Sequence, residues 1–330
     1  MIVDDISTRS SAPGQPSWTA RHLAHLRVRL FGISIDEARI ERRGFVVKNP
    51  ALVIRLETIG VNFIRAYNAA LAASSLRPLL EQLNAVSPEF RGFAFEGASM
   101  GLTVRDAVTP GASLWRAYIV GPALAQHYIS YVGHGWAFAR LPGPALWRAR
   151  RLKGPLRWLA FDGYGFHQGY FDWQRSIDAC LVDRRLRGYA LRAFDQGLGR
   201  SLWFVRGADV EAMAETIGRF EVKRRDDLWS GVGLAATYAG GLSTAELDHL
   251  VSASGRYRPQ LAQGAVFAAE ARFRAGIVTL DCERATRTLC RMSVVQAAHL
   301  AVTTQPDERM PDPEGTHYEI WRGDIRRRFA

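Results

Sequence analysis

Apolar residues recur at helical spacing through most of the chain, and this pattern predicts an all-α protein. Residues 50–73 form a long amphipathic segment whose apolar side chains fall on one stripe: Leu52, Ile59, Phe63, Tyr67 and Leu71. Residues 210–220 show the same pattern with Val210, Met213, Ile217 and Phe220. Ser243 is followed three positions later by Glu246, which is a capping box at the start of a further helix.

A short phrase containing glycine recurs at nearly constant intervals. Its first glycine, here called the anchor glycine, is Gly97, Gly133, Gly163, Gly197, Gly231 or Gly264, and the intervals are 36, 30, 34, 34 and 33 residues. The second residue after the anchor is small in five copies (Ser99, Gly135, Gly165, Gly199 and Gly233) and is Val266 in the sixth. The third is bulky: Met100, Trp136, Phe166, Arg200, Leu234 or Phe267. Glycine weakens a helix by ~1 kcal/mol relative to alanine, so its recurrence, together with small residues four after the anchor, indicates closely packed helices.

The residues between the phrases leave room for a second helix, so each unit is expected to be a helix–turn–helix of about 34 residues. This length resembles tetratricopeptide and Sel1-like repeats, and the predicted fold is a stack of helical hairpins forming a solenoid or toroid. We expect a disordered leader over residues 1–20 and one helical domain over residues 21–330. That domain divides into entry helices (21–90), repeats (about 91–300) and a C-terminal cap (301–330). One irregular helical domain without true repeats is the competing interpretation.

The residue before the anchor glycine is polar in five of the six copies. These residues, here called the polar row, are Glu96, Asp162, Gln196, Ser230 and Gln263, and Val132 is the apolar exception. Equivalent positions in stacked helices lie beside one another, so the row is expected to be continuous. A buried carboxylate is costly unless it is hydrogen-bonded, hydrated or shifted in pKa. The row therefore predicts hydrogen bonds between helices, or acid, base and orienting groups for a substrate; a strip facing solvent is a third alternative.

Asp162 and Glu96 are the predicted acid and base, with His167 assisting. Asp195, Gln196, Ser230 and Gln263 are predicted to bind the substrate. Trp136 and Trp203 would suit a long apolar or conjugated ligand if the array curves around a cavity. A core histidine satisfied by hydrogen bonds is the alternative for His167. No His or Cys spacing indicates a metal site, and the sequence identifies no cofactor.

Composition indicates an ordinary globular protein, with 48% hydrophobic and 23% charged residues. The net charge of +11 is spread along the chain, often beside acids, which disfavours nucleic-acid binding and leaves an acidic partner or phosphates as the alternative. The three cysteines form no CxxC pair, no segment approaches the ~20 apolar residues of a membrane helix, and no secretory signal is evident. These features predict a cytoplasmic location.

Several phrases together are similar to one bacterial family: GFAFEGASMGL, DGYGFHQGYF, AFDQGLGRSLWF, LWSGVGLAATYAGG and LAQGAVFAAEARFRAG. The chain resembles, from about residue 27 to 329, the UnbL-type family of unknown function, which is encoded beside enediyne polyketide synthases. The resemblance implies a role in processing a polyene intermediate. It also implies partners from the same gene clusters, including a membrane protein, and it supplies no catalytic residues.

These observations lead to the hypothesis of a natural-product biosynthesis protein. It would bind or transform a long hydrophobic, polyene-like intermediate in a helical cavity, and an enzymatic role is favoured with its reaction class unknown. The alternative is a non-catalytic helical scaffold that assembles biosynthetic partner proteins.

Overall fold

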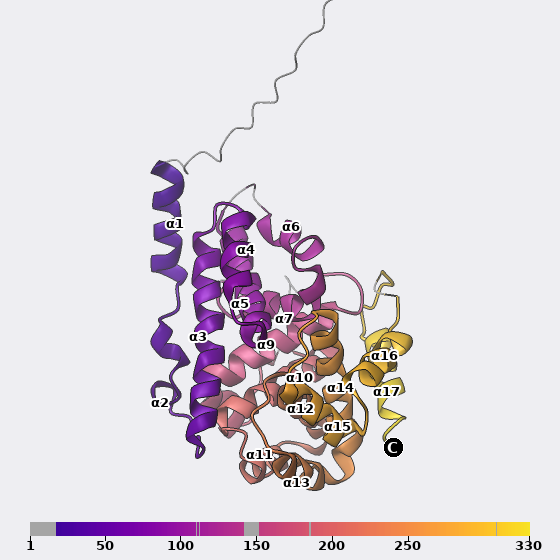
Figure 1. Cartoon of the computed structure of the whole chain (residues 1–330). Helices are drawn as coiled ribbons and strands as arrows, with labels where there is room; N and C mark the ends of the chain where they lie inside the picture. Colours follow the sequence, from indigo (N-terminus) through magenta and orange to yellow (C-terminus); the bar gives the residue numbers. More distant parts are fainter. Residues whose placement is uncertain (1–17, 110, 112, 142–151, 185, 308) are drawn as a thin grey trace, which may run out of the picture.

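The computed structural model describes residues 18–109, 111, 113–141, 152–184, 186–307 and 309–330, and every regular element in these residues is helical (Figure 1). The all-α prediction is confirmed. No helix in the described part of the chain is long and apolar enough to cross a membrane.

The centre of the bundle is a succession of helices in which each packs on the next in chain order. These core helices are α3 (Pro50–Ala72), α5 (Pro88–Ala107), α7 (His127–Ala137), α9 (Arg157–Phe171), α10 (Tyr189–Val205), α12 (Val222–Tyr238) and α14 (Arg258–Arg274). The long helix predicted over residues 50–73 thus ends one residue early, and Asn49 caps its start by accepting a hydrogen bond from the Ala51 backbone N–H.

The other helices connect or flank the core helices. The connecting helices are α4 (Leu76–Ala85), α6 (Leu114–Val120), α11 (Val210–Gly218), α13 (Thr244–Ser254) and α15 (Leu280–Cys290). Along α3 lie α1 (Trp18–Phe31) and α2 (Ile40–Arg43), while α16 (Val294–Thr304) and α17 (Thr316–Arg326) lie beside α14 at the opposite side of the bundle (Figure 1). Ser243 and Glu246 form the predicted capping box of α13.

Two boundary predictions need correction. Residues 18–20 of the predicted leader form the first turn of α1, and residues 1–17 lie outside the described residues. Between α9 and α10, the described residues contain only a short π-helical turn, Gln174–Asp178, instead of a second α-helix. This linker carries many charged residues and no sustained apolar stripe, so it has no face to bury along a helix.

The anchor glycines lie where successive core helices touch through their backbones. A Cβ built on Gly133, Gly163, Gly197, Gly231 or Gly264 would lie 1.8–2.1 Å from the carbonyl oxygen of the residue before the previous anchor glycine. At Gly197, for example, that atom is the Asp162 oxygen, at 1.8 Å. No real side chain fits at such distances, so the glycines are needed for the helices to approach this closely.

The small residue two positions after the anchor makes the next interface along the chain. A Cβ on Gly165 would lie 2.0 Å from the Phe194 oxygen of α10, and one on Gly199 would lie 2.1 Å from the Leu228 oxygen of α12. Positions two apart on a helix point about 200° apart, so α7, α9, α10 and α12 each use one glycine toward each neighbouring core helix. The predicted glycine packing is confirmed, but the spacing that matters is two residues, whereas the sequence had suggested four.

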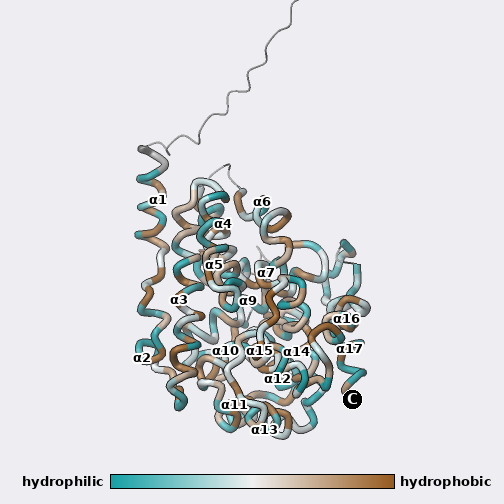
Figure 2. Tube along the Cα trace, in the orientation of Figure 1, coloured by the Kyte–Doolittle hydropathy of each residue, from teal (hydrophilic) through white to brown (hydrophobic). Residues whose placement is uncertain are grey.

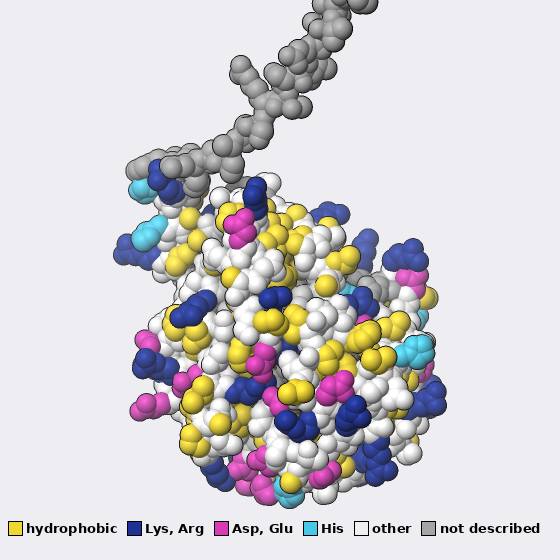
Figure 3. Space-filling view, viewed as in Figure 1, with side chains coloured by type: hydrophobic (Ala, Val, Ile, Leu, Met, Phe, Trp, Pro, Cys, Tyr) yellow, Lys and Arg dark blue, Asp and Glu magenta, His cyan; other side chains and the backbone are white. Residues whose placement is uncertain are grey.

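The helices form a bundle, and a tetratricopeptide- or Sel1-like solenoid is not confirmed. Hydrophilic and hydrophobic positions alternate along most of the trace, as expected for helices with one buried face (Figure 2). Basic and acidic side chains are interspersed over the face shown in Figure 3.

Candidate functional site

One face of each core helix points into the bundle. In the core helices that contain an anchor glycine, this face carries the positions one before, three after and seven after that glycine, which are four residues apart and therefore share a helix face. Phe166 and Tyr170 of α9 and Leu234 and Tyr238 of α12 follow this rule and line a cavity, here called the first cavity. Its wall also includes Ile59, Phe63, Phe93, Glu96, Trp136, Phe171, Arg200, Phe204 and Ala235.

The first cavity is mainly aromatic. The Trp136 ring centroid lies 4.6 Å from that of Phe63 and 4.7 Å from that of Phe166, and the Phe166 centroid is 5.5 Å from that of Phe204. The free space between these rings holds about three water molecules in this conformation. Such a wall offers π faces to a planar, conjugated ligand.

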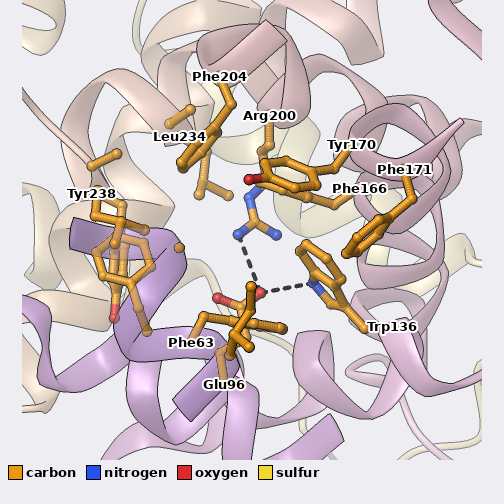
Figure 4. Close-up of a pocket in the computed structure, with 16 residues that line it drawn as sticks. Phe63, Glu96, Trp136, Phe166, Tyr170, Phe171, Arg200, Phe204, Leu234 and Tyr238 are labelled. Atoms are coloured by element: carbon orange, nitrogen blue, oxygen red, sulfur yellow. Dashed lines mark hydrogen bonds and ion pairs between the residues drawn. The ribbon is translucent and has the colours of Figure 1, made fainter. Parts of the chain in front are cut away.

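A carboxyl–guanidinium cluster lies in the middle of this apolar surface (Figure 4). Trp136 donates its indole N–H to Glu96 Oε1 at 3.0 Å, and Arg200 Nη2 is 3.7 Å from the same oxygen. Arg200 Nη1 donates to Asp162 Oδ1 at 2.5 Å. The three ionisable side chains are at most 3% exposed. One arginine is therefore shared by two buried acids from different helices.

Burial sets the protonation of this cluster. Burial raises the pKa of Glu96 to about 7, against the opposing effects of Arg200 and the Trp136 hydrogen bond. Burial lowers the pKa of Arg200, but Asp162 and Glu96 outweigh it, so this pKa is raised overall and the guanidinium stays charged. Glu96 consequently titrates near neutral pH beside a permanent cation.

The rest of the polar row continues away from the cluster as a hydrogen-bonded chain. Gln196 Nε2 donates to Asp162 Oδ2 at 2.8 Å. Ser230 Oγ then donates to Gln263 Oε1 at 2.9 Å and lies 3.3 Å from Gln196 Oε1. Gln263 Oε1 also accepts from Arg322 Nε at 3.1 Å. The predicted row is thus continuous, and hydrogen bonds between helices occupy its side chains, except for the buried Gln263 Nε2, which has no hydrogen-bond partner among the described residues.

The remaining predicted site residues lie outside both the cluster and the first cavity wall. Asp195 is turned to the other side of α10, where its carboxylate accepts from Arg224 at 2.9 and 2.5 Å. Trp203 is buried and donates to the Gly240 carbonyl oxygen. His167 packs edge-on against Trp136 and tilted against Phe171, and burial lowers its pKa to about 3. His167 is therefore a neutral imidazole behind the cavity wall.

Sequence reasoning missed Arg200 as the centre of the site. It was counted among the bulky residues three after the anchor, where the other five are Met100, Trp136, Phe166, Leu234 and Phe267. A single cation in an otherwise apolar inward series was the available signal, because a buried arginine needs acid partners. Its partners are the two acids of the polar row.

A second cavity lies on the other side of Arg200. Its wall includes Ile129, Val132, Leu159, Asp162, Arg200, Leu234, Tyr238, Phe267, Ala268, Glu270, Tyr318 and Trp321. Its free space is likewise sufficient for about three water molecules. No group of three or more His, Cys, Asp and Glu side chains that could hold a metal ion occurs in the described ranges.

These features define an all-helical protein with an aromatic interior and a buried carboxyl–guanidinium cluster at its centre. The chain belongs to the DUF1702 family of proteins of unknown function, which it matches over residues 22–329. No curated protein and no solved structure matches it. The predicted membership of an uncharacterised family is confirmed at this level.

Proposed function

We propose that this protein binds an elongated, largely apolar and unsaturated small molecule inside the bundle and exchanges a proton with it through Glu96. The observation that carries the proposal is the environment of the Glu96 carboxyl. Oε1 is held by Trp136 and Arg200, while Oε2 makes no hydrogen bond with the described residues. An oxygen free of protein partners at an aromatic cavity is available to a ligand.

The protonation of Glu96 suits acid–base chemistry. A general acid or base works best when its pKa is near the ambient pH, and burial raises the pKa of Glu96 to about 7. Asp162 has both oxygens occupied, by Gln196 and Arg200, so its role is to position Arg200. Arg200 in turn stabilises negative charge that develops on a ligand oxygen.

Isomerisation of a conjugated system is a reaction class that needs only these groups. One C–H bond breaks as Glu96 takes the proton, and the electron pair shifts the adjacent double bonds. A new C–H bond forms at another carbon when Glu96 returns a proton. Atoms and electrons balance without a co-reactant. A polyketide-type polyene of the enediyne clusters fits this ligand class, and that identity rests on the family resemblance alone.

The alternative of a scaffold for partner proteins has less support. The polar row and the aromatic rings that would have formed a docking face point inward, and the row residues are at most 2% exposed. Partner docking needs accessible side chains, whereas a small ligand needs an enclosed apolar site.

Two measurements test the proposal. Diphenylhexatriene, a fluorescent apolar polyene, should bind saturably, with energy transfer from tryptophan that decreases in Trp136→Phe. β-Ionone, a conjugated ketone, incubated in D2O should take up deuterium faster with the protein than in buffer. Glu96→Gln should abolish that acceleration and retain diphenylhexatriene binding.

Glu81→Gln is the matched control, because Glu81 is an exposed acid on α4 that pairs with the exposed Arg77. This variant should behave as wild type in both assays. Absence of saturable diphenylhexatriene binding overturns the ligand proposal. Equal deuterium uptake by wild type, Glu96→Gln and buffer overturns the role of Glu96.

A further inference from the structure

The two interior cavities share one wall. Arg200, Leu234 and Tyr238 are the residues that line both. All three belong to the inward face of α10 or α12, at the positions three or seven residues after the anchor glycine. The cavities are therefore separated at their common wall by side chains that project into the bundle.

We propose that the two cavities are the arms of one ligand channel, interrupted by the Arg200 side chain, and that the ligand is a chain occupying both arms with an oxygen function in its interior. This inference rests on the proposed function and specifies its ligand class. It predicts a chain whose two hydrocarbon ends lie on opposite sides of Arg200, with a mid-chain carbonyl or hydroxyl oxygen at the guanidinium.

Arg200 is bound more closely by one of its two acids than by the other, and this difference supports a movable partition. Its contact with Asp162 is 2.5 Å, while its distance from Glu96 is 3.7 Å. The ion pair between Arg200 and Glu96 is therefore the weaker of the two, and it weakens further when Glu96 takes up a proton and loses its charge. Arg200 can then give up its contact with Glu96 while keeping Asp162 as its stronger partner, so the guanidinium is free to turn at the partition.

The distribution of polarity supports an internal oxygen function. Charged groups meet at the partition, with Glu96 in the first arm and Asp162 in the second. The other acid of the second arm, Glu270, is paired with Arg274 at 2.8 Å. Phe63 and Phe204 extend the first arm as apolar surface, and Leu159 and Phe267 do so in the second. A chain with its polar group at one end would fill one arm and leave the other empty. A chain with an internal oxygen places apolar carbon in both arms and the oxygen beside the guanidinium.

The second arm also shows a direction toward the surface. Glu270, which lines it, accepts a hydrogen bond from Arg274 at 2.8 Å. Glu270 is buried, whereas the Arg274 side chain is 32% exposed. The Glu270–Arg274 pair therefore joins the wall of this arm to the protein surface, and the proposal places the outer end of the channel there.

Matched blocking variants test the channel. Ala235 lines only the first cavity of the two and Ala268 only the second, and both are nearly fully buried. Ala235→Phe and Ala268→Phe each place a ring in one arm. Ala85→Phe, at the exposed end of α4, is the control.

Two fluorescent diphenylpolyenes of different length serve as probes: stilbene, whose length the proposal assigns to one arm, and diphenyloctatetraene, whose length it assigns to both. Each arm has free space for about three water molecules in this conformation, so both probes require the side chains of the wall to move apart. Each blocking variant should weaken diphenyloctatetraene binding by at least about tenfold and leave stilbene binding within about threefold of wild type. Ala85→Phe should change neither. If a blocking phenylalanine lowers the melting temperature markedly, the leucine variant at the same position replaces it.

The outcomes separate the channel from the proposed function. Loss of long-probe binding in only one blocking variant, or in neither, overturns the channel, while retained stilbene binding keeps the ligand proposal. Failure of wild type to bind either probe overturns both. As a second readout, Trp136→Phe and Trp321→Phe should each reduce energy transfer to bound diphenyloctatetraene, because these residues line different arms. Loss from only one of them contradicts a ligand that spans the partition.

Discussion

Two charge networks in this molecule, one fully buried and one partly buried, have opposite compositions. In the cavity network, Arg200 is shared by two acids, Glu96 and Asp162. In the network under α17, the two acids Asp227 and Glu319 are surrounded by three arginines: Arg192, Arg322 and Arg326. Arg322 Nη1 lies 2.7 Å from Asp227, and Arg192 bridges Asp227 and Glu319 at 3.0 and 3.1 Å.

The ratio of cations to acids decides what each network does. Burial raises the pKa of Glu319, but the three arginines outweigh it and hold that pKa at about 2. Burial prevails at Glu96, where one shared arginine leaves the pKa at about 7. The ion pairs of the α17 network therefore stay charged and attach the last helix to the bundle, whereas the cavity network retains one exchangeable proton. Charge networks of similar appearance thus have a structural role in one place and, as we propose, a chemical role in the other.

Removing Arg322 should have the largest effect. Arg322→Leu leaves the buried Asp227 without one of its partners and removes the link from α17 to Gln263, so we expect a loss of ~3–5 kcal/mol in unfolding free energy. Urea denaturation followed by circular dichroism measures this. Arg327→Leu, whose side chain is 72% exposed, should change stability by no more than ~0.5 kcal/mol. Equal effects of the two substitutions would contradict a fastening role.

Replacing Glu96 should alter the pH dependence of stability. The pKa of Glu96 is about 7 in the folded protein, above its usual value of 4.5. Wild type is therefore most stable relative to Glu96→Gln below pH 4.5. That advantage should fall by ~3 kcal/mol as the pH rises to about 7 and remain level above it. Urea midpoints of both proteins between pH 4 and 8 measure the difference. Asp195, whose pKa burial raises to about 6, is present in both proteins and cancels. Parallel profiles would refute a titrating Glu96.

A glycine substitution tests whether backbone contact places the cavity network. In Gly197→Ala the new Cβ would meet the Asp162 carbonyl oxygen, so α9 and α10 must move apart at a cost of ~1–3 kcal/mol. Asp162 should then hold Arg200 less well, and diphenylhexatriene binding should weaken. Gly323→Ala in α17 is the control, because its Cβ meets nothing closer than 3.8 Å. This change should stabilise by up to ~1 kcal/mol through helix propensity. Similar losses in both variants would remove the special role of the anchor glycine.

The packing of the core could be predicted because it depends on residue size at a fixed register. The glycines at positions 163 and 197 indicate that two helices approach closely, however the chain connects them. The polar row could be predicted because its residues directly precede the anchor glycines. The predictions that failed concern which side of a helix a side chain faces. Asp195 precedes Gln196 by one residue, about 100° around the helix, so only one of them can face the interior. Counting polar residues near the anchor could not distinguish them, but the four-residue spacing from Gln196 to Arg200 could have.

The sequence did not predict how strongly the succession of core helices curves. In a straight stack, Glu96 and Asp162 would lie two units apart, roughly 20 Å, at ~10 Å per pair of helices. In the structure both contact Arg200, because the core helices surround the interior. Crossing angles depend on which side chains interdigitate at each contact, and periodicity alone does not report them. The polar row was therefore predictable, and the cluster at its centre was not.

The smallest expected effect comes from Glu319, and its sign is opposite to that of Glu96. The pKa of Glu319 is about 2 in the folded protein, below its usual value of 4.5, so its contribution to stability is present above pH 4.5 and is lost as the pH falls toward 2. The side chain is 28% exposed, and solvent screening reduces the expected contribution to ~1–2 kcal/mol.

Glu319→Gln should therefore be less stable than wild type at pH 7, with a difference that shrinks as the pH falls from 5 to 3. Urea denaturation over that range measures it, with Glu81→Gln as the exposed control that should show no such trend. Because wild type loses its advantage over Glu96→Gln on raising the pH and over Glu319→Gln on lowering it, the two difference curves must slope in opposite directions. Slopes of the same sign would mean that the balance of cations and acids does not set the protonation of these two networks.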